Sequence, residues 1–183
     1  MKKLLLAVLL LSSIGLIHAD SILKNTDFTD GASNWNGDGK SPTDLPGFTD
    51  KGIIIALKPH DWTTITQDFT TDSANVTLTV SYRLAPSTTF STNPDDYANV
   101  PQSISYTSWK PFKGKVGGWM IILSDLAKQQ IFFGSILPPA NATELQTFSG
   151  AYNRMIPGDN NTLCLAFPPG TGAVILQHVS LDK

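Results

Sequence analysis

Aromatic and charged side chains are concentrated between residues 86 and 118, a stretch without a strand pattern. Connections this long in a compact domain are usually either functional or disordered. Aromatic faces and polar groups together suit the recognition of ring-shaped, hydroxyl-rich ligands. The expected ligand-binding residues are Tyr97, Tyr106, Trp109 and Lys110, with Arg83 on the preceding segment. The alternative is that the aromatics pin the loop onto the domain while the lysines form a solvated rim.

Groups that could carry catalysis are sparse. Glu144 is the only glutamate, so a carboxylate pair for glycoside hydrolysis would have to recruit aspartates, and the adjacent Asp95 and Asp96 are more typical of solvated charge. His60 and His178 follow the leader, but no Ser-His-Asp set can be singled out and no histidine or cysteine spacing predicts a transition-metal site. We therefore expect no enzyme, no cofactor and no metal.

The first 19 residues have the organisation of a secretory leader. Lys2 and Lys3 precede an apolar run over residues 4–17, and Ala19 is a small residue suited to signal peptidase. A membrane anchor is the alternative, but the run is shorter than the roughly 18–20 residues that span a bilayer. We expect cleavage, a secreted or periplasmic chain over residues 20–183, and no stable membrane insertion after the leader is removed.

Charge and length restrict the remaining classes. The chain has 13 Lys and Arg against 15 Asp and Glu, and loss of the leader removes two of the lysines. An acidic chain lacks the clustered cations that bind phosphate backbones, so nucleic acid is excluded as a partner. The length predicts one domain. Cys164 is the only cysteine, and its alternating apolar neighbours predict a buried structural thiol, so no intrachain disulfide contributes stability.

Apolar and polar residues alternate along most of the chain, which predicts an all-β fold. The clearest case is the run over residues 75–84, in which Val76, Leu78 and Val80 share one face and the intervening threonines the other. Trp35, Trp62 and Trp119 are expected in the core. Further strands are expected at residues 53–58, 63–69, 119–124, 130–133, 145–152, 162–167 and 173–181. This number of short strands predicts an antiparallel β-sandwich.

Three segments resemble CenC-type carbohydrate-binding modules. They are the opening Asn25, Phe28, Gly31 and Trp35, the stretch over residues 61–71 before a Tyr-Arg strand, and the turn over residues 168–172. The resemblance implies a galactose-binding-like jelly roll over residues 20–183, with a long loop at about residues 86–118, and a poly- or oligosaccharide partner. Modules of this kind often hold a structural calcium ion between an acidic residue after the early Phe and an Asp in the last strand.

The calcium positions of such modules correspond here to Thr29 and Gln177. Calcium prefers six to eight oxygen ligands that include carboxylates, so the loss of both charges weakens such a site. Asp27 and Asp30 lie nearby and leave a shifted, weak site open, although capping of the turn is the simpler role for them.

Two functions follow from the sequence. The first is a secreted or periplasmic, non-catalytic glycan-binding protein that uses the aromatic loop over residues 86–118. The alternative is a structural or protein-interaction β-sandwich of the cell envelope that binds no sugar, because one fold hosts many functions. The sequence predicts neither the glycan nor the oligomeric state.

Overall fold

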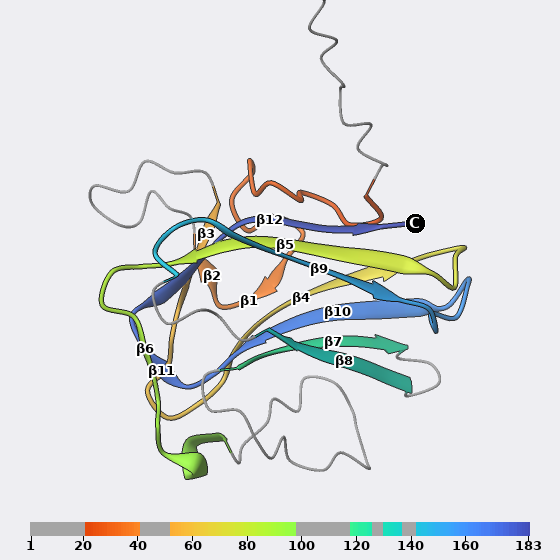
Figure 1. Cartoon of the computed structure of the whole chain (residues 1–183). Coiled ribbons are helices and arrows are strands. Elements are labelled where there is room, and N and C mark those ends of the chain that lie inside the picture. Colours follow the sequence, from red (N-terminus) through yellow and green to blue (C-terminus); the bar gives the residue numbers. More distant parts are fainter. Residues whose placement is uncertain (1–20, 41–51, 98–117, 126–129, 137–141) are drawn as a thin grey trace, which may run out of the picture.

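The computed structural model describes residues 21–40, 52–97, 118–125, 130–136 and 142–183. The predicted leader over residues 1–19 lies outside this part. The described chain forms two five-stranded antiparallel sheets stacked face to face (Figure 1). The expected antiparallel β-sandwich of jelly-roll type is therefore confirmed. Within the described ranges, no helix is both long and apolar enough to cross a bilayer.

Each sheet has a two-residue strand at one edge and longer strands in its other positions. The first sheet runs in the order β1 (Asn36–Gly37), β4 (Thr63–Thr70), β10 (Asn160–Phe167), β7 (Trp119–Asp125) and β8 (Gln130–Ile136). The second runs in the order β2 (Gly39–Lys40), β3 (Ile53–Ala56), β12 (Ala173–Asp182), β5 (Val76–Leu84) and β9 (Gln146–Tyr152). A small two-stranded sheet pairs β6 (Thr89–Phe90) with β11 (Gly170–Thr171).

Alternation of side chains explains why these segments are strands. Along β5 every second residue is buried and the residues between are only half-buried, as expected for a strand that covers a core on one face. The residues of β10 after Asn160 are buried on both faces of the sheet. Tyr82 of the second sheet packs against Trp119 of the first, with ring centroids 4.2 Å apart. The core therefore lies between the sheets and joins them directly.

The N-terminal segment closes one side of the sandwich. The backbone N–H of Ile22 donates to the Leu181 carbonyl at 2.8 Å, and the Val179 N–H donates to the Thr26 carbonyl at 2.9 Å. The first described residues thus lie beside the end of β12, close to the C-terminus (Figure 1). From the other sheet, the buried Gln67 of β4 accepts from the Lys24 N–H at 2.6 Å and donates to the Lys24 carbonyl at 3.0 Å.

The strands expected from sequence agree with the structure to within a few residues. Trp35, Trp62 and Trp119 are all buried, and Cys164 is fully buried, as predicted. The two-residue strands β1, β2, β6 and β11 were not predicted, because they are too short to show alternation and form only where another strand offers its edge. Residues 86–118 contain β6 and a 3-10 helix, η2 (Pro94–Tyr97), within their described part.

Gln67→Leu tests the attachment of the N-terminal segment. The leucine keeps the volume of the side chain but removes both hydrogen bonds to Lys24, so we expect a loss of about 1–3 kcal/mol in the free energy of unfolding. Urea unfolding followed by tryptophan fluorescence measures this loss. Thr70→Ala, at an exposed position of the same strand, is the matched control and should change stability little. An unchanged midpoint for Gln67→Leu would show that this attachment contributes nothing.

Candidate functional site

Two connections meet at one end of the sandwich, and β11 joins them. One is the turn between β3 and β4, and the other is the segment that follows β6. Gly170 of β11 donates its N–H to the Lys58 carbonyl at 2.8 Å, while the Ser91 N–H donates to the Pro169 carbonyl at 2.8 Å. Because the β6–β11 pair holds both segments, residues far apart in the sequence are brought together here.

The segment after β6 is shaped by its own polar side chains. The Asn93 N–H donates to Ser91 Oγ at 3.1 Å, and Asn93 Oδ1 in turn accepts from the Asp95 N–H at 3.2 Å. Asn93 therefore stands at the N-cap of η2, with Pro94 in the first helical position, as both residue types favour. This local arrangement turns the Asp96 carboxylate back toward Ser91.

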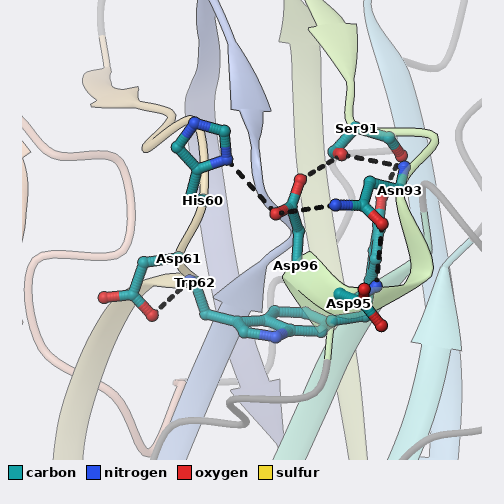
Figure 2. A network of polar contacts seen from close by, with 8 residues as sticks. His60, Asp61, Trp62, Ser91, Asn93, Asp95 and Asp96 are labelled. Atoms are coloured by element: carbon teal, nitrogen blue, oxygen red, sulfur yellow. Dashed lines mark hydrogen bonds and ion pairs between the residues drawn. The ribbon is translucent and has the colours of Figure 1, made fainter.

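Asp96 is the centre of the network (Figure 2). One carboxylate oxygen accepts a short hydrogen bond from the Ser91 hydroxyl, and the other lies 3.2 Å from His60 Nδ1 and 3.5 Å from Asn93 Nδ2. The Ser91 hydrogen bond, together with a smaller effect of His60, holds the pKa of the Asp96 carboxyl below its ordinary value, against the opposing effect of partial burial. Asp96 thus ties the segment after β6 to the turn before β4.

An aromatic pair lies beneath the polar network. Tyr97 is only 6% exposed, its ring meets that of Trp62 edge-on with centroids 5.8 Å apart, and its hydroxyl donates to the Ser91 carbonyl at 2.7 Å. Trp62 itself is buried, and its backbone N–H donates to the Asp61 carboxylate at 2.8 Å. The pair fixes the end of the described part of the loop on the sandwich.

The arrangement favours hydrogen bonding over catalysis. The His60 side chain is 84% exposed, and Asn93 and Asp95 are also exposed, so donors and acceptors face solvent at this end of the molecule. Ser91 and His60 both contact the carboxylate, which lies between them. In a nucleophilic triad the histidine stands between the serine and the acid, so this order does not activate the serine. Among the described residues, no group of three or more His, Cys, Asp or Glu is placed to hold a metal.

The ligand-binding residues predicted from sequence fall in three places. Tyr97 lies beside the network, buried against Trp62. This position matches the alternative interpretation, in which the aromatics pin the loop onto the domain. Arg83 is half-buried on the outward face of β5, opposite Ile175 of β12. Tyr106, Trp109 and Lys110 lie outside the described residues.

Sequence reasoning did not assign His60, Ser91 or Asn93 to the site. The run Ser91-Thr92-Asn93-Pro94-Asp95 carries a usable signal, because Asn followed by Pro marks the start of a helix. His60 carried no such signal, since its contact with Asp96 depends on the pairing of β6 with β11.

Comparison with known proteins identifies the fold. No protein-family model matches the chain, and no curated protein matches its sequence. Among solved structures, the CBM22-1 xylan-binding domain from Paenibacillus barcinonensis Xyn10C is similar at 8% identity with a TM-score of 0.56, covering 90% of this chain and 94% of that one. The fold is that of carbohydrate-binding modules.

Two further structures show the same likeness. TmCBM61, in complex with β-1,4-galactotriose, is 10% identical with a TM-score of 0.53, covering 89% of this chain and 98% of that one. The family 11 module from Clostridium thermocellum, in complex with a β-1,3-1,4-mixed-linked tetrasaccharide, is 10% identical with a TM-score of 0.51, covering 89% of this chain and 95% of that one. At these identities the likeness concerns the fold.

Asp96→Asn tests the role of the central carboxylate. A carboxyl whose folded-state pKa is lowered contributes stability above its ordinary pKa of 3.8, and this contribution is lost as the pH falls through the folded-state value. The difference in unfolding free energy between the native chain and the variant should therefore shrink from about pH 6 to about pH 3. Urea unfolding across this range measures it, with the exposed Asp95→Asn as the matched control. A difference that stays constant with pH would contradict the assignment.

Proposed function

We propose that the chain is a secreted or periplasmic, non-catalytic protein that binds a poly- or oligosaccharide through the loop over residues 86–118. The observation that carries the proposal is the Asp96 network, which fixes the first part of this loop and leaves polar side chains exposed beside it. The jelly-roll fold supports it, because solved modules with this fold are described as bound to oligosaccharides. The finer resemblance to CenC-type modules is part of the same proposal.

The exposed groups of the network match the chemistry of sugar hydroxyls. The Asn93 amide donates and accepts, the Asp95 carboxylate accepts, and the imidazole of His60 offers its second ring nitrogen to solvent. Such groups fix the orientation of a ligand, whereas aromatic faces supply most of the contact area. The network therefore supplies the polar half of a glycan site.

We expect the aromatic contacts with the sugar to come from residues that follow Tyr97 in the sequence. Tyr97 ends the described part of the loop, and we expect it to act by holding the loop in place, because its ring and hydroxyl are already engaged. Tyr106, Trp109 and Lys110 are proposed to contact the sugar directly. Arg83, on β5 just before the loop, is proposed at the border of the same surface.

The non-catalytic and secreted parts of the proposal have separate support. The single glutamate and the position of Asp96 between Ser91 and His60 argue against hydrolysis by a carboxylate pair or a serine nucleophile. The charged start, apolar run and small residue at Ala19 support export. N-terminal sequencing of the chain recovered from the periplasm or medium tests the cleavage site.

Binding of the mature chain to a glycan array, followed by pull-down with the insoluble polysaccharides of the best class, tests the function. We expect binding to one class, with Trp109→Ala reducing it at least about tenfold, because one stacked aromatic face contributes roughly 1–3 kcal/mol. Asn93→Ala should weaken binding less, by about two- to tenfold, through loss of a hydrogen bond and of the helix cap.

Ser149→Ala is the matched control for these variants, because it changes one exposed polar side chain on β9, a strand outside the loop. It should bind like the native chain. Circular dichroism must show that each variant is folded before its binding is compared. Absence of binding across the array by the folded native chain would favour the envelope-protein alternative. Binding that survives Trp109→Ala and Asn93→Ala unchanged would move the site away from the loop.

A further inference from the structure

The N-terminal turn, residues 25–35, is held together by backbone and amide donors. The Asn25 side chain donates to the carbonyls of Gly31 and Ser33, each at 2.9 Å, and its Oδ1 accepts from the Asp30 N–H at 3.3 Å. The Asn25 carbonyl accepts from the Phe28 N–H at 3.2 Å. The Asn25 side chain thus connects the start of the turn to three later residues of it.

The core supports this turn from below. Phe28 and Trp35 are both buried, and their rings pack with centroids 5.5 Å apart. Trp35 Nε1 points back to the Asn25 carbonyl at 3.4 Å. Asn25 and Phe28 both have positive φ, 50° and 53°, a conformation that costs a non-glycine residue energy and is kept only where the surroundings fix it. The turn therefore has a defined structure, in which the carbonyls of Asn25, Gly31 and Ser33 accept hydrogen bonds from within the turn.

The turn is joined to the last strand by a carboxylate and an imidazole. Asp27 Oδ1 lies 2.6 Å from His178 Nδ1. Because an ionised carboxylate can only accept, the hydrogen of this bond belongs to the Nδ1 atom of His178. A β-bulge between Leu176 and His178 shifts the register of β12 against β5, after which Val179 and Leu181 return to the core. The bulge leaves His178 on the outward side of the strand, beside Asp27.

In CenC-type modules, which the sequence resembles, calcium would join the same two segments, but the residues present here do not fit it. Thr29 and Gln177 stand at the positions that supply carboxylates there. The carbonyls of Gly31 and Ser33 already accept from Asn25, and the Asp27 carboxylate accepts from the His178 imidazole. A calcium ion needs six to eight oxygens, and an N–H donor aimed at the carboxylate opposes a cation at the same place.

We infer that the Asp27–His178 contact, together with the Asn25 amide, replaces a structural calcium ion in joining the N-terminal turn to β12, so that the fold is independent of calcium. A metal ion would draw the oxygens of the two segments together around one charge. Here, hydrogen-bond donors satisfy the oxygens of the turn, and one imidazole bridges from the strand. The inference concerns the architecture and does not depend on the proposed glycan binding.

Thermal unfolding of the mature chain tests this inference in two steps. First, the melting temperature should be the same in millimolar calcium and in excess EGTA. Calcium that bound only the native state would raise the melting temperature, so an equal value shows that the fold does not use the ion. Second, Asp27→Ala and His178→Ala should each lower the melting temperature by about 2–5 °C, and the double variant should lower it by about as much as either single one. Asp30→Ala, an exposed aspartate of the same turn, is the matched control and should melt like the native chain.

A calcium-dependent rise in the melting temperature of the native chain would overturn the inference, and that measurement needs no variant to fold. Fully additive losses in the double variant would also overturn it, since they would show that Asp27 and His178 act separately. A drop as large for Asp30→Ala as for Asp27→Ala would assign the effect to the general charge of the turn and would count against the inference as well.

Discussion

Burial of the facing surfaces of β10 and β12 is the interaction on which the rest of the structure depends. Both are central strands, each with one neighbour on either side, and both carry long buried runs. Each large apolar side chain buried in such a core contributes roughly 1.5–3 kcal/mol. Because the chain has only one cysteine, no internal cross-link can share this task. The contact of Tyr82 with Trp119 connects the two sheets, and Phe167 of the first sheet packs on the same Trp119 ring.

The positions of the Asp96 network and of the N-terminal turn are set by the strands of this core. The Asp96 network exists because β11, which directly precedes β12, leads the chain past the ends of β3 and β6. The N-terminal segment is attached because β12 continues beyond its bulge, where Val179 pairs with Thr26 and Leu181 pairs with Ile22 through their backbones. The same strand therefore supports a candidate ligand site at one of its ends and a closing turn at the other.

The strands could be predicted from sequence because alternation is a local signal. β5 shows it without interruption, and the buried tryptophans followed from residue type and context. The network could not be predicted, since His60 and Asp96 are 36 positions apart and meet only after a two-residue strand has paired. Asp27 and His178 are 151 positions apart, and a bulge sets their meeting. Aspartates in a turn indicate capping from sequence alone, and only the folded chain shows which partner they have.

The anchoring of residues 91–97 has a consequence for the entropy of any binding event at this end of the molecule. A side chain that is ordered only when a ligand arrives loses roughly 0.5–1.5 kcal/mol of conformational freedom. Asn93 is already held through its Oδ1 by the Asp95 N–H, and Tyr97 is held by its hydroxyl and by its ring. Most of their ordering therefore takes place during folding, and a ligand that meets this surface encounters groups already in position.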